Sequence, residues 1–148
     1  MTKIVVRPVV REDLPGLLDL YQHLNPKDPK LDAAKVEAAW DALANSRGNT
    51  IFVADVSGAL MASCVLSIIP NLTRGARPYA VIENVVTHAE HRRGGLGRAV
   101  MTAALDAAWD AGCYKVMLAS GRDELTLRFY ENIGFKRGGK TFFEMRRV

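Results

Sequence analysis

The chain has 148 residues, of which 49% are hydrophobic and 24% are charged. This length and balance predict a single globular domain over residues 1–148 and exclude a disordered chain. The formal net charge of +4 comes from Lys and Arg residues that are scattered rather than grouped with aromatic residues, a pattern that argues against nucleic acid as a partner and favours a small polyanionic ligand.

The beginning of the chain lacks the apolar stretch of a signal peptide, and no later window is long and apolar enough for a membrane span. We therefore expect a cytoplasmic protein without a membrane partner. The two cysteines, Cys64 and Cys113, have neither CxxC spacing nor His residues at metal-ligand offsets. They are expected to be reduced core residues, and no metal is expected.

The N-terminal third predicts a strand followed by a helical hairpin. β-branched residues indicate a strand over 3–9, and Glu12, Asp13 and Pro15 then mark the first turn of a helix. A break rich in Pro and Lys over 25–30 ends this helix. The apolar positions of the second helix predict a buried stripe, which consists of Val36, Ala39, Trp40 and Leu43.

Three strands are predicted next. The runs 50–56 and 59–69 are expected to pair antiparallel through a tight turn at Ser57-Gly58. An Arg-containing loop then leads into the run 79–87, the longest apolar strand predicted, which we place at the centre of the sheet.

The second half of the chain predicts a long amphipathic helix over 95–111, where apolar residues recur at every fourth position, closed by Gly112. A short buried strand over 114–119, a helix over 124–133 and a terminal strand over 141–147 follow. This order predicts a mixed α/β fold, with a central mixed sheet of six to seven strands flanked by about four helices that cover both faces.

The segment between the predicted central strand and the long helix is rich in Gly and Arg. Glycines allow the backbone to approach a ligand closely, and the first turn of a helix offers unpaired N–H groups at the positive end of its dipole. Guanidinium groups beside those amides suit a pyrophosphate. The segment comprises Arg92, Arg93, Gly94, Gly95, Leu96, Gly97 and Arg98. It predicts an anion site, and a diphosphate is the expected ligand.

Two other phosphate motifs do not match this segment. A P-loop needs Lys followed by Ser or Thr, whereas Gly97 is followed by Arg98 and Ala99. The dinucleotide fingerprint needs a third glycine where Val100 stands, and no βαβ unit opens this chain.

At this turn the sequence resembles the GNAT superfamily of N-acetyltransferases, whose signature is Arg or Gln followed by x-x-Gly-x-Gly or Ala. The signature appears as Arg92-Arg93-Gly94-Gly95-Leu96-Gly97, and the family's late FY-x-x-x-GF pattern appears over Phe129–Phe135. Three local runs, 82–86, 112–116 and Phe129-Tyr130, look like those of glucosamine 6-phosphate N-acetyltransferases. The resemblance spans nearly the whole chain and implies acetyl-CoA as co-substrate.

The resemblance also implies which residues hold acetyl-CoA. Backbone groups of Val85, Val86 and Thr87 would bind the pantetheine arm as a pseudo-strand, and the amides over 93–98 would bind the pyrophosphate. The family often has a cofactor-contacting Asn upstream of its late Phe-Tyr pair, which the stretch 122–126 lacks. The expected cofactor-binding residues are therefore Val85, Val86, Thr87, Arg92, Arg93, Gly94, Gly95, Leu96, Gly97 and Arg98.

Direct attack of an amine on a thioester requires one group that accepts a proton and one that protonates the departing thiolate. Glu83 is the expected base, because a carboxylate that interrupts an apolar strand is costly there unless it is hydrated or paired. Its alternative role is an ion pair with a neighbouring Lys or Arg. Tyr130 matches the family's usual general acid, and its alternative role is packing against Phe129 and Phe135.

The resemblance thus implies an enzyme that transfers the acetyl group of acetyl-CoA to a primary amine of a small molecule, phosphorylated or otherwise anionic. Arg74 and Arg77 are candidates to bind the anionic group, with Tyr21 and Tyr79 as pocket walls, and plain solvent exposure is the alternative for both Arg residues. Other functions stay open: a catalytically silent acyl-CoA-binding module, an acetyltransferase of protein N-termini or lysines, or a basic nucleic-acid binder. The apolar pair Phe142-Phe143 makes a homodimer a candidate assembly.

Overall fold

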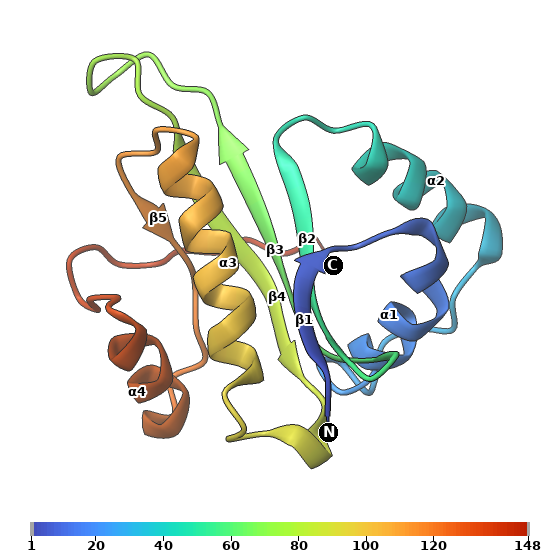
Figure 1. Ribbon diagram of the computed structural model, residues 1–148. Coiled ribbons are helices and arrows are strands. Elements are labelled where there is room, and N and C mark those ends of the chain that lie inside the picture. Colours follow the sequence, from blue (N-terminus) through green and yellow to red (C-terminus); the bar gives the residue numbers. More distant parts are fainter. Residues whose placement is uncertain (1, 148) are drawn as a thin grey trace. The chain divides into compact units, whose positions relative to one another are not determined.

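The computed structural model of the protein describes residues 2–147 (Figure 1). The two end positions of the domain expected over 1–148 lie outside this range. The described chain divides into two compact units, one that ends at Met117 and one that begins at Leu118. The first unit contains the sheet and three α-helices, and the second contains one α-helix.

The sheet of the first unit has the strand order β1-β2-β3-β4-β5. The first four strands pair antiparallel as successive neighbours, and β5 pairs parallel with β4. The mixed α/β class is therefore confirmed, but within residues 2–147 the sheet has five strands and not the six to seven expected. The strands are β1 (Ile4–Pro8), β2 (Asn49–Val56), β3 (Ala59–Ile69), β4 (Tyr79–Thr87) and β5 (Val116–Met117).

Four α-helices accompany the sheet within the described residues, as expected, and none of them has the length and apolar character needed to cross a membrane. Local capping fixes where two of them begin. Asp32 accepts a hydrogen bond from the Lys35 backbone N–H, and Asp123 accepts one from that of Thr126. The helices are α1 (Leu14–Tyr21), α2 (Ala33–Ala44), α3 (Leu96–Asp110) and α4 (Glu124–Ile133), with short 3-10 helices η1 (Arg11–Asp13) and η2 (Ala89–His91).

The core of the first unit lies on both faces of the sheet. α1 covers one face, where Leu17 packs in a cluster with Ile51 and Val53 of β2. α3 lies across the other face (Figure 1), where the buried Cys64 thiol donates a hydrogen bond to the Val100 carbonyl oxygen at 3.4 Å. Burial raises the pKa of the Cys64 thiol to about 12, so it is a neutral core group at pH 7. Burial from both sides explains why residues 51–54 of β2 and most of β3 are apolar.

The Leu17 cluster provides a test of this packing. Leu17 is 2% exposed, and truncating it to Ala in Leu17→Ala leaves a cavity that is expected to lower the free energy of unfolding by about 2–5 kcal/mol. Leu72 is 94% exposed, so Leu72→Ala, the same chemical change, is expected to cost less than about 0.5 kcal/mol. Urea unfolding of both variants measures the difference, and equal losses would contradict the described core.

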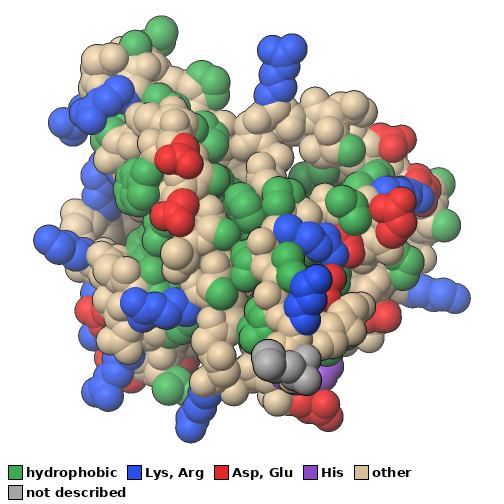
Figure 2. All heavy atoms as spheres, in the orientation of Figure 1, with side chains coloured by type: hydrophobic (Ala, Val, Ile, Leu, Met, Phe, Trp, Pro, Cys, Tyr) green, Lys and Arg blue, Asp and Glu red, His purple; other side chains and the backbone are tan. Residues whose placement is uncertain are grey.

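The second helix is less buried than its sequence predicted. Of the expected stripe, three residues are half-buried and Ala39 is exposed. Polar contacts replace part of the expected core: the Arg11 guanidinium donates to a Glu37 carboxylate oxygen at 2.6 Å and lies 5.8 Å from the Trp40 ring centroid. Acidic and basic side chains accordingly lie side by side over α1 and α2 (Figure 2).

Two predictions about strands are wrong. β3, with 11 residues, is longer than β4, with 9, and β3 lies in the middle of the strand order. The segment 141–147 forms no strand, and its apolar side chains Phe142, Phe143 and Met145 are 65%, 87% and 99% exposed. An apolar run becomes a strand only where a neighbouring strand pairs with its backbone groups, and none within residues 2–147 does so here.

Candidate active site

β4 carries one extra residue relative to β3. Val65 pairs with Glu83 and Ser63 pairs with Val86, so two steps along β3 correspond to three along β4. Asn84 lies in this interval with a φ of 52°, a left-handed conformation that is uncommon outside glycine. The resulting bulge bends β4 and changes the direction of the backbone groups that follow Glu83.

The C-terminal half of β4 has an open edge. β5 pairs with β4 only at Ala80 and Val81, and no other strand within residues 2–147 pairs with this edge between Ile82 and Thr87. Backbone groups on such an edge can bind an extended ligand as an added strand. The residues expected to bind pantetheine, 85–87, all lie on this open half.

The turn after β4 presents backbone amides at the start of α3. Gly95 is the N-cap residue with a φ of 82°, and Arg93 is also left-handed, with a φ of 69°. The amide of Ala99 donates to the Gly95 carbonyl oxygen at 3.0 Å and is the first to bond within the helix, so the amides over 96–98 have no partner inside it. Leu96 is buried and anchors the turn to the core. An anion placed here would meet the first amides of α3 and the positive end of the helix dipole.

The three Arg residues of this turn differ in their surroundings. The Arg92 side chain folds back onto the protein, where Nε donates to the Thr87 carbonyl oxygen at 3.3 Å and Nη2 donates to that of His23 at 3.5 Å. Arg93, before α3, and Arg98, in its first turn, are exposed. The predicted segment 92–98 is thus gathered in one turn, and it presents Arg93 and Arg98 to solvent.

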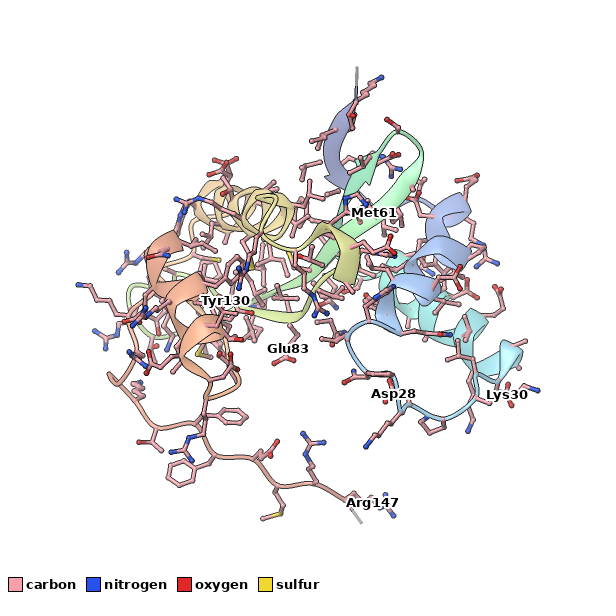
Figure 3. All side chains as sticks on the ribbon, turned by 90° about the horizontal axis from the view of Figure 1, so that it is seen from below. Asp28, Lys30, Met61, Glu83, Tyr130 and Arg147 are labelled. Atoms are coloured by element: carbon pink, nitrogen blue, oxygen red, sulfur yellow. The ribbon has the colours of Figure 1, made fainter. Side chains whose placement is uncertain are left out.

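Glu83 is exposed on β4, immediately before the bulge. Its pairing with Val65, which packs against the Leu17 cluster, places its side chain on the α1 face of the sheet. Figure 3 shows Glu83 projecting away from β4. No salt bridge within residues 2–147 includes Glu83, so the ion-pair role considered for this carboxylate has no partner there.

Tyr130 lies on α4 in the second unit. Its ring makes edge contacts with the rings of Phe129 and Phe135, at centroid distances of 5.0 and 6.1 Å. At the C-terminal end of α4, the Phe135 amide donates a hydrogen bond to the Tyr130 carbonyl oxygen at 3.1 Å. The packing role considered for Tyr130 is therefore present, and its service as a general acid stays a prediction.

A group of cations surrounds the Tyr114 ring just before β5. The guanidinium carbons of Arg74 and Arg77 lie 5.8 and 5.6 Å from the ring centroid, and Lys115 Nζ lies 5.4 Å from it. Lys115 Nζ is also 5.5 Å from the centroid of Tyr79. Three expected substrate residues thus come together with two that sequence reasoning missed. We call Arg74, Arg77, Tyr79, Tyr114 and Lys115 the Tyr114 cluster.

The loop that carries the two Arg residues of this cluster has an unusual backbone. Arg74, Gly75 and Ala76 have successive φ values of 55°, 71° and 58°, a left-handed turn that residues with a Cβ adopt only at an energetic cost. Hydrogen bonds hold it: Asn71 Nδ2 donates to the Arg77 carbonyl oxygen at 3.1 Å, and Arg77 Nε donates to that of Arg74 at 3.0 Å. The loop therefore fixes both Arg side chains beside Tyr114.

Tyr21, the fourth expected substrate residue, lies elsewhere. Its hydroxyl group is hydrogen-bonded to Ser63, and burial raises the pKa of the phenol to about 12. Ser63 pairs with Val86, whereas Tyr79 pairs with Ile69, six positions further along β3, or about 20 Å at roughly 3.3 Å per residue. Tyr21 is thus level with the bulge, and the structure does not join it to the Tyr114 cluster in one pocket wall.

Known proteins resemble this chain over most of its length. A family model described as the acetyltransferase (GNAT) family matches residues 17–135, a range that contains both sequence motifs. The glucosamine 6-phosphate N-acetyltransferase of Trypanosoma brucei brucei is 35% identical over 142 residues, which cover 92% of this chain and 93% of that protein.

Solved structures show the same relationship. A provisionally named acetyltransferase from Agrobacterium tumefaciens is 49% identical, with a TM-score of 0.92 and coverage of 97% of this chain and 99% of that one. An acetyltransferase from Trypanosoma brucei is 30% identical, with a TM-score of 0.84 and coverage of 97% and 100%.

Proposed function

Because the chain belongs to the acetyltransferase (GNAT) family, a family of N-acetyltransferases, we propose that it transfers the acetyl group of acetyl-CoA to a primary amine of a small molecule by direct attack. One observation carries the proposal. The open edge of β4 beyond Val81 leads through η2 to the turn that exposes the first amides of α3, so an extended arm and a diphosphate find their partners in the order in which acetyl-CoA carries them.

The cofactor would be bound mainly by the backbone. The amide groups of pantetheine pair with the open edge over 85–87, as an added strand would. The pyrophosphate accepts hydrogen bonds from the amides over 96–98 and meets the charges of Arg93 and Arg98. A backbone N–H of β4 beside the bulge polarises the thioester carbonyl and stabilises the charge that develops on its oxygen.

Two side chains would manage the protons. Glu83, directly or through water, takes a proton from the ammonium form of the acceptor, and the neutral amine attacks the thioester carbon. A C–N bond forms and the C–S bond breaks, and the thiolate of CoA takes a proton from Tyr130. The second amine proton leaves the nitrogen as the amide forms and passes through water to the Tyr130 phenolate. The free, exposed carboxylate of Glu83 supports its part of this scheme, and the matched late motif supports that of Tyr130.

The Tyr114 cluster supports an anionic acceptor. No salt bridge within residues 2–147 neutralises Arg74, Arg77 or Lys115, so a phosphate or carboxylate would supply the missing charge. Because successive side chains of a strand point to opposite faces, Tyr79 and Glu83 lie on the same face of β4. They are about 13 Å apart along the strand at roughly 3.3 Å per residue. An acceptor whose amine reaches Glu83 can therefore direct its anionic group toward the cluster. Glucosamine 6-phosphate, the substrate in a relative's name, has both groups.

Acetyl-CoA turnover tests the function. Thiol release is followed with amino-sugar phosphates, amino acids, polyamines and peptides that offer an N-terminal or lysine amine. Turnover on a small anionic amine is the expected result. Turnover on peptides alone would replace the proposal by a protein acetyltransferase, and tight CoA binding without turnover would replace it by a binding module.

Lys115→Gln tests the acceptor site. Loss of one charged contact is expected to raise the KM for an amino-sugar phosphate about tenfold, while the KM for acetyl-CoA and for the same sugar without phosphate stays within about twofold. Lys35→Gln, an exposed Lys on α2, is the matched control and is expected to change none of the three. An equal rise for both sugars would contradict phosphate recognition by the cluster.

Location and assembly stay predictions. A cytoplasmic protein is expected from the sequence. The exposure of Phe142 and Phe143 favours a homodimer that covers them, and sedimentation of the parent against a variant with Ser at both positions would detect it.

A further inference from the structure

The segment that follows α1 meets the end of β4 in a contact between two imidazoles. The ring centroids of His23 and His88 are 4.0 Å apart. His88 Nδ1 accepts a hydrogen bond from the Glu90 amide at 3.2 Å and so caps η2, while His23 Nδ1 accepts one from the Ala89 amide at 3.4 Å. His23, which follows α1, thus holds η2, the short helix that leads into the segment 92–98, which we call the phosphate turn.

Arg92 makes two further contacts where the segment after α1 meets the end of β4. Its two hydrogen bonds, to the carbonyl oxygens of Thr87 and His23, join the last residue of β4 to the segment after α1. Its backbone is extended, with φ −66° and ψ 148°, and the left-handed Arg93 follows immediately. The side chain therefore ties down the residue at which the chain changes direction toward α3.

We propose that Arg92 is a positioning residue for the phosphate turn and not a ligand of the phosphates, an inference that rests on the proposed function. Two of its N–H donors are committed to carbonyl oxygens, and those bonds set the path of the turn that exposes the amides over 96–98. Arg93, one position on, has no hydrogen bond or ion pair to any described residue and supplies charge to the ligand directly. The hydrogen bond from Arg92 to the His23 carbonyl oxygen also links the phosphate turn to the segment after α1.

Amide hydrogen exchange without CoA tests the positioning role by itself. In Arg92→Ala, exchange over residues 88–99 is expected to rise about tenfold, because two hydrogen bonds that hold the turn are lost. Arg92→Gln keeps side-chain N–H donors without the charge and is expected to stay within about threefold of the parent. Arg93→Ala is the control that removes a neighbouring charge and is expected to leave exchange unchanged. Unchanged exchange in Arg92→Ala would overturn the proposal.

Calorimetric binding of CoA at several salt concentrations separates position from charge. Arg93→Ala is expected to weaken binding and to flatten its dependence on salt, because a charge that faces phosphate is lost. Arg92→Ala is expected to weaken CoA binding about tenfold and to keep the salt dependence of the parent. Arg92→Gln is expected to keep most of the parent's affinity for CoA. A flattened salt dependence in Arg92→Gln would identify Arg92 as a phosphate ligand and overturn the proposal. A parent that fails to bind CoA would contradict the proposed function, whereas the exchange result needs no ligand.

Discussion

Glu83→Gln is expected to lower the kcat of acetyl transfer by about 100- to 10,000-fold, the usual contribution of a general base, while the KM for acetyl-CoA stays within about twofold. The amide side chain has nearly the size of the carboxylate but cannot accept the proton of the acceptor. Because Glu83 is exposed and makes no salt bridge within residues 2–147, its replacement breaks no structural ion pair.

The control for Glu83 is a second exposed carboxylate on the same unit. Asp106→Asn, on the solvent side of α3, removes the same charge far from the proposed chemistry and is expected to leave kcat within about twofold. Steady-state kinetics with saturating acceptor, together with the melting temperature of each variant, measure both effects. A Glu83→Gln enzyme with the kcat of the parent would remove Glu83 from the mechanism.

Gly95→Val is expected to raise the dissociation constant for acetyl-CoA roughly 5- to 150-fold, which corresponds to about 1–3 kcal/mol of backbone strain. Gly95 has a φ of 82° at the N-cap of α3, a conformation in which a β-branched side chain is a genuine outlier. A Cβ built on Gly95 meets no atom within 4 Å, so the penalty comes from the backbone conformation and not from a clash with the protein.

Gly95→Asn separates conformation from obstruction of the ligand. Asn adopts the left-handed region more readily than other residues with a Cβ, so its affinity is expected to lie within about threefold of the parent. Calorimetry with acetyl-CoA gives both constants. If Asn weakens binding as much as Val does, a side chain at this position blocks the ligand and the strain argument fails.

The turn over 92–98 and the start of α3 could be predicted because their signals are local. One short stretch holds the glycines of the helix start, the Arg residues beside them and the apolar residues that recur at every fourth position. In the structure α3 begins at Leu96, as this pattern predicts. The same holds for the hairpin of β2 and β3, whose turn residues Ser57 and Gly58 both have positive φ values.

Features that depend on pairing between distant segments could not be predicted. The bulge at Asn84 arises from the register of β4 on β3, and the sequence of β4 carries no sign of it. Lys115 joins the Tyr114 cluster only because β5 lies beside the start of β4. The contact of Arg92 with the His23 carbonyl oxygen joins residues 69 positions apart in the sequence and could not be predicted either.

The segment 141–147 shows the opposite error. Its apolar and aromatic residues have the composition of a strand, and composition alone suggested one. A strand also needs a partner for its N–H and C=O groups, which sequence cannot reveal, and no strand within residues 2–147 pairs with it.

The binding site itself is tested most directly by amide chemical shifts of the ¹⁵N-labelled chain during titration with acetyl-CoA. The largest shifts are expected at the amides of Leu96, Gly97 and Arg98, with a second set over 85–87 on the open edge of β4. Saturable shifts confined to other parts of the chain would contradict the assignment of acetyl-CoA to this turn, and the absence of any shift at millimolar ligand would contradict acetyl-CoA as the co-substrate.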